Sequence, residues 1–208
     1  MTGDVTPPAL LLAGWSRSGT TMVTRLASEL PQVRFPAGES QFFRYCGRGL
    51  VLRHGPRPRR TAVRQALGRY RDHWSGSDMG VEPDAVMERL AGARPHIADV
   101  YAVVVDLATG GSARPSDKSN LNAEWLEVVL DRFATTRAVA VVRDPRAVFV
   151  SARELGWLTS PAAFARSWAR VQGTLLRLAS GPAADRVVLL RYEDVVADPD
   201  RVGRALSE

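Results

Sequence analysis

Three short apolar runs lie along the chain, and each is followed by a polar segment. The runs are Ala9–Ala13, Ala138–Val142 and Val187–Leu190. Their length and aliphatic content are typical of strands that are buried on both faces of a parallel sheet. After the first run, apolar residues recur at helical spacing over residues 22–30, and Pro31 ends the helix that this spacing predicts.

Two weaker strands and one long helix continue this alternation. Val33–Phe35 and Arg114–Lys118 are expected to be short strands, and residues 162–179 are expected to form a long amphipathic helix. Strands that alternate with helices predict an α/β fold in which a parallel sheet is flanked by helices. Ligands of such sheets bind at the carboxyl ends of the strands, so the polar segments after the three apolar runs are the places to look for a site.

Two helix starts can also be predicted. Asp144 is suited to an N-cap, and Pro145 behind it fits the first helical position. Asn120 or Asn122 is expected to cap a helix whose apolar face begins at Trp125.

Residues 44–111 interrupt the alternation and resemble a helical insertion. Residues 44–74 predict one or two surface helices, and residues 82–109 predict a further helical stretch that Gly110–Gly111 closes. Val103–Asp106 would also suit the aspartate-bearing strand of an ATPase, but the surrounding helical period favours a helix.

The composition fits one globular domain spanning residues 1–208, because 45% of the residues are hydrophobic. The formal net charge is +6, which favours an anionic ligand without identifying it. Only one of the 28 basic residues is a lysine, Lys118. Eight arginines lie between Arg48 and Arg71. They form either a solvated helical face or an electrostatic funnel for an anionic donor or acceptor.

Several classes of protein are disfavoured. A single cysteine, Cys46, cannot form an internal disulfide. The histidines have no partner at metal-ligand spacing, so we expect no metal site. The apolar runs are too short to span a membrane, and the N-terminus carries Asp4 without a basic segment, unlike a signal peptide. The default expectation is a soluble, cytoplasmic protein.

The segment Gly14–Thr21 has the spacing of a phosphate-binding loop between a strand and a helix. Its two glycines allow backbone N–H groups to converge, and the helix N-terminus favours an anion. Thr20 stands where nucleotide-hydrolysing enzymes carry their loop lysine, and the cation, Arg17, lies inside the loop instead. We therefore expect an anion site that is poorly suited to Mg-ATP hydrolysis. The alternative is an ordinary glycine-rich turn.

A second signal follows the run Ala138–Val142. Arg143 ends this strand, and Ser151 lies eight residues later, about two turns into the next helix. An arginine offers a planar fork to a phosphate, and a hydroxyl can complete such a site. Taken alone, Arg143 would serve equally well as a structural arginine paired with a carboxylate.

Taken together, residues 17–21, Arg143 with Ser151, and residues 191–194 resemble the sulfotransferases that use 3′-phosphoadenylyl sulfate. The resemblance implies a sulfotransferase fold related to the P-loop nucleoside triphosphatases. It implies that the first loop, with Arg17, Ser18, Gly19, Thr20 and Thr21, holds the 5′-phosphosulfate. It also implies that Arg143 and Ser151 hold the 3′-phosphate.

The resemblance extends to two candidate catalytic residues. Glu39 is similar in position to the catalytic glutamate of Golgi-type and tyrosylprotein sulfotransferases, where a carboxylate takes the proton of the acceptor hydroxyl. Lys118 is similar to the family lysine that contacts the transferring group. The chain thus looks closer to these enzymes and to bacterial sulfotransferases than to the histidine-based cytosolic ones. The alternatives are a solvated turn glutamate and an exposed lysine.

Tyr192 follows the last predicted strand. It would pack on the adenine, reach a phosphate, or serve as a core tyrosine. The implied reaction is an in-line sulfuryl transfer in which Arg17 lies against the sulfuryl or bridging oxygen, and fixed cations act without a metal.

Two other functions stay open: a P-loop kinase or nucleoside triphosphatase, and a non-catalytic protein that binds the donor. We expect no nucleic acid partner, because no aromatic-rich strand motif is present. The acceptor is a hydroxyl on a small molecule, carbohydrate, lipid or peptide. Family members usually continue beyond the position of Glu208 with a segment that closes over the donor, so the chain is expected to be shortened or a fragment.

Overall fold

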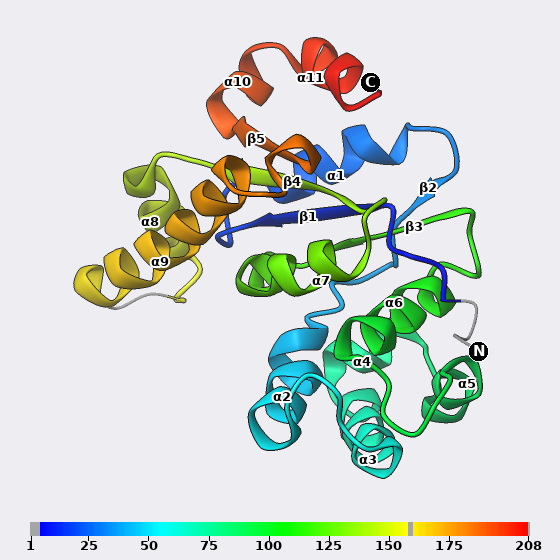
Figure 1. The fold of residues 1–208 in the computed structure, drawn as a ribbon. Helices are drawn as coiled ribbons and strands as arrows, with labels where there is room; N and C mark the ends of the chain where they lie inside the picture. Colours follow the sequence, from blue (N-terminus) through cyan, green and yellow to red (C-terminus); the bar gives the residue numbers. More distant parts are fainter. Residues whose placement is uncertain (1–4, 158–159, 208) are drawn as a thin grey trace.

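The computed structural model describes residues 5–157 and 160–207. Its centre is a sheet of β1 (Leu10–Gly14), β2 (Val33–Arg34), β3 (Arg114–Lys118), β4 (Arg137–Val142) and β5 (Val187–Arg191). The strand order is β2-β3-β1-β4-β5, and every neighbouring pair is parallel (Figure 1). The predicted α/β fold with a parallel sheet is therefore confirmed. All five strands end at the same edge.

Side chains of the central strands alternate between two apolar layers. Leu10 and Leu12 of β1 face one layer, whereas Leu11 and Ala13 face the other. The strand is fully buried on both sides, as its unbroken apolar run predicts. The first layer also receives side chains from α1 (Thr20–Ser28), α10 (Tyr192–Ala197) and α11 (Pro199–Ser207), which lie above the sheet in Figure 1.

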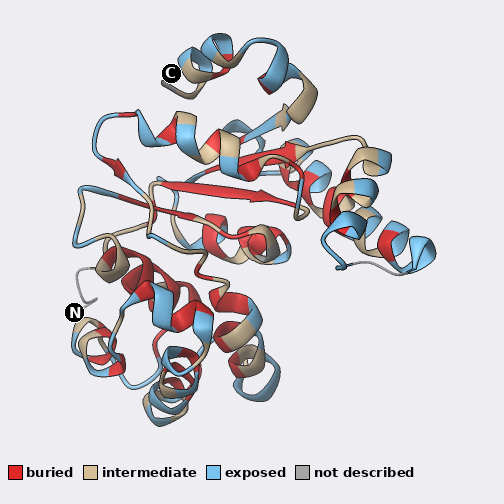
Figure 2. Ribbon diagram, turned by 180° about the vertical axis from the view of Figure 1, so that it is seen from behind, coloured by how far each residue is buried: buried red, intermediate tan, exposed pale blue. Residues whose placement is uncertain are grey.

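The second layer carries the larger hydrophobic core, which continues from the sheet into the helices of residues 43–108. Helix α6 (Ile97–Ala108) is buried almost all round, and Figure 2 shows the buried residues concentrated in the strands and in the helices next to them. Burial of one large aliphatic side chain stabilises a fold by about 1.5–3 kcal/mol. The helices α7 (Leu126–Arg132) and α9 (Pro161–Ser180) cover the rest of this face.

The segment between β2 and β3 contains only helical elements, in agreement with the predicted helical insertion. It begins with a π-helical turn, η1 (Phe43–Gly47), followed by α2 (Arg48–His54), α3 (Arg60–Arg71), α4 (Trp74–Met79), α5 (Pro83–Arg89) and α6. Val103–Asp106 lies within α6, so the alternative of an ATPase-like strand is wrong.

Two local predictions need correction. The helical stretch of residues 82–109 is divided into α5 and α6. Neither Asn120 nor Asn122 is an N-cap, since both lie within the 3-10 helix η2 (Asn120–Trp125), which leads directly into α7. The predicted cap at Asp144 is confirmed, and it opens α8 (Pro145–Glu154).

The arginines of residues 48–71 are not all solvated. The Arg60 guanidinium donates hydrogen bonds to the carbonyl oxygens of Met87 and Leu90 at 2.5 and 2.6 Å, and so ties α3 to the end of α5. Arg64 instead pairs with Asp84 at 2.7 Å in an exposed position. Within the described ranges, no helix has the length and apolar character needed to cross a membrane.

Candidate active site

The loop between β1 and α1 carries backbone N–H groups that no side chain caps. Its helix starts at Thr20 without a side-chain cap, so the first N–H groups of α1 point towards the loop without a side-chain partner. The Ser18 hydroxyl is fully buried and makes no hydrogen bond with any described residue. A buried polar group normally finds a partner, so this hydroxyl is an exception within the loop.

Both loop glycines are required by close packing. A Cβ atom on Gly14 would lie 2.7 Å from the carbonyl oxygen of Val141 in β4. Gly19 has φ = 94°, and its Cβ would lie 2.2 Å from Cδ2 of Tyr192. The ring of Tyr192 thus covers Gly19, which is a packing role that the sequence did not distinguish from binding of adenine or phosphate.

Three predicted donor-binding residues come together although more than 120 positions separate the loop from the other two. Arg17, with φ = 70°, donates a hydrogen bond from Nε to the Ser151 hydroxyl at 3.0 Å. Arg143 donates from Nη1 to the Arg17 carbonyl at 2.9 Å. Its guanidinium also lies 4.2 Å from the centre of the Tyr192 ring. The Nε atom of Arg143 is buried and has no partner among the described residues.

The helix that carries Ser151 is held at its first turn. Asp144 accepts a hydrogen bond from the Arg146 backbone N–H at 2.8 Å, and hydrogen bonds from Arg146 lower the pKa of Asp144 to about 2. Glu193 accepts the Asp144 backbone N–H at 3.0 Å, which joins α8 to α10. A cavity of about 490 Å³ opens beside these residues, and Arg143, Arg191 and Trp168 also line it.

Glu39 and Lys118 form a direct ion pair, with 2.5 Å between Oε1 and Nζ. Their side chains are 24% and 17% exposed, so the pair is shielded but reachable. It lies in a cavity of about 250 Å³ that is also lined by Thr21 and Thr24 of α1. The two candidate catalytic residues therefore meet next to the start of the helix that follows the loop.

Thr20 does not substitute for the missing loop lysine. Its hydroxyl is buried and donates to Oδ1 of Asn120 at 2.8 Å. The nearby ammonium group comes instead from Lys118, at the end of the adjacent strand β3.

Sequence reasoning missed a buried carboxylate beneath the ion pair. Oδ2 of Asp117 accepts hydrogen bonds from Ser40, Tyr101 and Asn122 at 2.6, 2.7 and 2.9 Å. Burial raises the pKa of Asp117, and the hydrogen bonds from Ser40 and Tyr101 oppose this rise. Because Ser40 follows Glu39 and Asp117 precedes Lys118, the network joins the two segments that carry the ion pair. The available signal was the polar composition of β3 within an apolar sheet.

The helical insertion also fixes the backbone next to Glu39. The Ser40 carbonyl accepts hydrogen bonds from the Tyr70 hydroxyl at 2.6 Å and from the Ser75 hydroxyl at 2.7 Å. Ser75 also lies 2.8 Å from the Glu39 carbonyl. Across the described parts of the chain, no group of three or more His, Cys, Asp or Glu side chains is arranged to hold a metal ion.

Solved structures with the same fold agree with this architecture. The sulfotransferase domain of the Synechococcus PCC 7002 olefin synthase matches with a TM-score of 0.57 and 23% identity, covering 97% of this chain and 73% of that one. The sulfotransferase domain from the curacin biosynthetic pathway matches with 0.53 and 20%, covering 96% and 72%. A sulfotransferase from Alicyclobacillus acidocaldarius matches with 0.53 and 16%, covering 97% and 79%.

No significant match was found among curated proteins. The family model described as "Sulfotransferase family" matches residues 8–208, which includes the loop, the Arg143–Ser151 segment and the Glu39–Lys118 pair. The chain belongs to the sulfotransferase family.

Proposed function

We propose that this protein transfers a sulfuryl group from 3′-phosphoadenylyl sulfate to an acceptor hydroxyl. One observation carries the proposal: the carboxyl edge of the sheet gathers an open anion loop, an arginine cluster and the Glu39–Lys118 ion pair. A donor with two phosphates and a sulfuryl group needs separate anion sites, and the acceptor hydroxyl needs a group that takes its proton.

The residues present fit the two phosphates of the donor. The N–H groups of residues 19–21 and the Ser18 hydroxyl are suited to the 5′-phosphate, because each is a donor without a side-chain partner in the described parts of the chain. Arg143 and Ser151 are suited to the 3′-phosphate, and the unpartnered Nε of Arg143 would gain an acceptor there. Arg17 lies between the two sites through its bond to Ser151. We assign its Nη groups to the sulfuryl or bridging oxygen.

Glu39 and Lys118 are assigned to the transfer itself. Glu39 accepts the proton of the acceptor hydroxyl while the acceptor oxygen forms a bond to sulfur. Lys118 stabilises the negative charge that remains on the donor phosphate oxygen when its bond to sulfur breaks. Their ion pair orients both groups before the donor arrives. The fixed cations supply the positive charge of this step, so we propose a reaction that needs no metal.

The catalytic roles can be tested with Glu39→Gln and Lys118→Ala. Glu39→Gln is expected to lower kcat by about 10²–10⁴-fold, the range for loss of one acid–base group. Lys118→Ala is expected to lower kcat by about 10²–10³-fold, the range for loss of one group that stabilises transition-state charge. The binding of 3′-phosphoadenosine 5′-phosphate should persist. Glu29→Gln is the control for Glu39→Gln, because Glu29 is an exposed glutamate at the far end of α1. Full activity in a folded Glu39→Gln or Lys118→Ala variant would remove that residue from the mechanism.

The donor assignment has its own test, which is thermal stabilisation by 3′-phosphoadenosine 5′-phosphate, by adenosine 5′-phosphate and by Mg-ATP. Stabilisation should require the 3′-phosphate. Arg143→Gln should weaken binding by about tenfold or more, because a hydrogen bond to a charged group is worth about 1.5–3 kcal/mol. Arg137→Gln, at the opposite end of β4, should leave binding unchanged. A response to Mg-ATP alone would indicate a kinase or nucleoside triphosphatase instead.

Three finer assignments belong to the same proposal. The glutamate-based type is supported by the direct contact of Glu39 with Lys118. The acceptor class and the cytoplasmic location stay predictions. Binding of 3′-phosphoadenosine 5′-phosphate without any turnover across a broad panel of hydroxyl acceptors would indicate a non-catalytic binding protein.

A further inference from the structure

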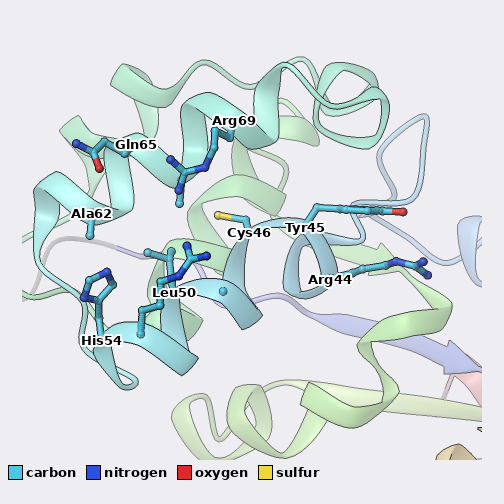
Figure 3. A pocket seen from close by; sticks show the side chains of 11 residues that line it. Arg44, Tyr45, Cys46, Leu50, His54, Ala62, Gln65 and Arg69 are labelled. Carbon is cyan, nitrogen blue, oxygen red and sulfur yellow. The ribbon is translucent and has the colours of Figure 1, made fainter.

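The helical insertion contains a cavity of its own, away from the loop and the ion pair. It has a volume of about 420 Å³ and lies between η1, α2 and α3 (Figure 3). Its lining carries no acidic residue, and it includes three arginines and one histidine: Arg44, Arg53, Arg69 and His54. We refer to this cavity as the arginine pocket.

In the described parts of the chain, no carboxylate pairs with the arginines of the arginine pocket. Among residues 5–157 and 160–207, Arg44, Arg53 and Arg69 form no ion pair. Arg60 and Arg64 of the neighbouring α3 do find carbonyl or carboxylate partners. Arg53 and Arg69 are exposed and line one cavity from different helices, so an anion bound between them would be attracted by both guanidinium groups.

The shape of the pocket indicates the class of anion. Its inner wall is apolar or uncharged, with Leu50, Ala62, Ala66 and buried Cys46, and Figure 3 shows Arg69 pointing from α3 towards α2 across this wall. A volume near 420 Å³ lies in the range of small-molecule sites. Arginine forks are matched to carboxylate, sulfate and phosphate oxygens. A ring-sized molecule with one such anionic group could therefore contact the arginines with that group and pack its ring against the apolar wall.

Two features connect the arginine pocket with the active site. Arg44 lines both the pocket and a second cavity of about 290 Å³, which is also lined by Trp15 and Ser16 of the phosphate loop. The turn η1, which supplies Arg44 and Cys46, begins four residues after Glu39. An extended molecule bound in the pocket would thus lead towards the loop that precedes α1.

We propose that the arginine pocket binds an anionic group of the acceptor, a carboxylate, sulfate ester or phosphate ester that is remote from the hydroxyl to be sulfated. This assignment rests on the proposed sulfotransferase function. It makes the acceptor an elongated anionic molecule and gives the helical insertion a role in substrate selection.

Site-resolved protection tests the pocket separately from the donor site. Phenylglyoxal modifies arginines, and peptide mass spectrometry reports which ones. Glucose 6-sulfate should protect Arg53 and Arg69, whereas uncharged glucose should not. 3′-Phosphoadenosine 5′-phosphate should protect Arg143 and leave the pocket reactive. If 3′-phosphoadenosine 5′-phosphate fails to protect Arg143 while glucose 6-sulfate protects Arg53 and Arg69, the donor assignment is refuted and the pocket is not. If Arg143 is protected but Arg53 and Arg69 are not, only the pocket is refuted.

A charge-matched pair of variants completes the test, with the donor site saturated by 3′-phosphoadenosine 5′-phosphate. Arg53→Gln with Arg69→Gln should weaken glucose 6-sulfate binding at least tenfold. Arg48→Gln with Arg59→Gln removes the same charge from exposed positions outside the pocket and should leave the Kd unchanged. Equal weakening in both pairs would show non-specific attraction and overturn the pocket as a site.

The final arm separates an acceptor subsite from a site for a free anion. With sulfated and unsulfated forms of one oligosaccharide acceptor, the Arg53→Gln, Arg69→Gln variant should raise the KM of the sulfated form about tenfold at unchanged kcat. The KM of the unsulfated form should not change. An unchanged KM for both forms, with glucose 6-sulfate binding lost, would overturn the acceptor assignment.

Discussion

Replacing Gly19 by alanine should damage the site through two separable effects. A non-glycine residue in the left-handed region costs about 1–2 kcal/mol, and Gly19 has φ = 94°. The added Cβ would lie 2.2 Å from Cδ2 of Tyr192, whereas carbon atoms in contact lie about 3.5–4.0 Å apart. The ring would have to move, and overpacking of this kind costs about 1–3 kcal/mol. The free energy of unfolding should therefore fall by about 2–5 kcal/mol.

The same substitution should weaken donor binding, because the displaced ring supports Arg143. The Arg143 guanidinium lies 4.2 Å from the ring centre and holds the Arg17 carbonyl. Loss of one charged hydrogen bond is worth about 1.5–3 kcal/mol, so the Kd for 3′-phosphoadenosine 5′-phosphate should rise about tenfold or more. Urea unfolding measures the first effect, and calorimetric titration measures the second.

Two controls separate strain from collision. Tyr192→Ala in the Gly19→Ala background should remove the collision and leave the backbone strain, so a double-mutant cycle should give a coupling energy of about 1–3 kcal/mol. Gly68→Ala lies within α3, has open space around its Cβ, and should raise stability by about 0.5–1 kcal/mol. Wild-type stability and wild-type Kd in Gly19→Ala would refute the packing argument.

Three further results are expected. Asp117→Asn can keep the three hydrogen bonds at one oxygen but loses the charge. Because burial raises the folded pKa of Asp117, the stability from this group is present below the ordinary value of 3.8 and is lost as pH rises above it. In urea unfolding from pH 3 to 8, the free energy of unfolding of the variant should therefore rise relative to that of the wild type. Asp144→Ala should lower thermal stability through loss of the α8 cap. Because the pKa of Asp144 is about 2 in the folded protein, the stability difference between wild type and variant should hold above pH 3.8 and fade as pH falls through 2. A stability difference that does not depend on pH would contradict this. Burial raises the pKa of Cys46 to about 12, so the thiol should react with a disulfide reagent at pH 8 only after unfolding; rapid reaction of the native protein would contradict its burial.

The buried network beneath the ion pair explains how the helical insertion holds the backbone next to Glu39. Tyr70 and Ser75 hold the Ser40 carbonyl, and the Ser40 hydroxyl binds Asp117. Ser40 follows Glu39, and Asp117 precedes Lys118 on β3. These hydrogen bonds therefore connect the insertion to the sheet through the residues next to Glu39 and Lys118. Precise placement of this kind is what a positioned acid–base group requires.

Local features of the chain were predictable from the sequence. The apolar runs predicted β1, β4 and β5, and Asp144 followed by Pro145 predicted the start of α8. The loop glycines were recognisable from their spacing between a strand and a helix, and the structure shows that close packing leaves no room for a side chain at either position. The failed prediction of an asparagine cap has a tertiary cause in the case of Asn120, because its Oδ1 atom accepts a hydrogen bond from the Thr20 hydroxyl instead of from a helix N–H. Asn122 lies inside the 3-10 helix and donates from Nδ2 to the buried Asp117.

The sequence by itself determined the parallel α/β sheet, the anion loop and the residue types that sulfuryl transfer needs, because these follow from short-range periodicity and backbone geometry. Only the tertiary structure decided which of those residues meet. The pairing of β2 with β3 brings Glu39 to Lys118, and the pairing of β1 with β4 brings Arg17 to Arg143, across separations of 79 and 126 residues. The packing of Tyr192 on Gly19, the Asp117 network and the arginine pocket arise in the same way, because each depends on which helices cover which face of the sheet.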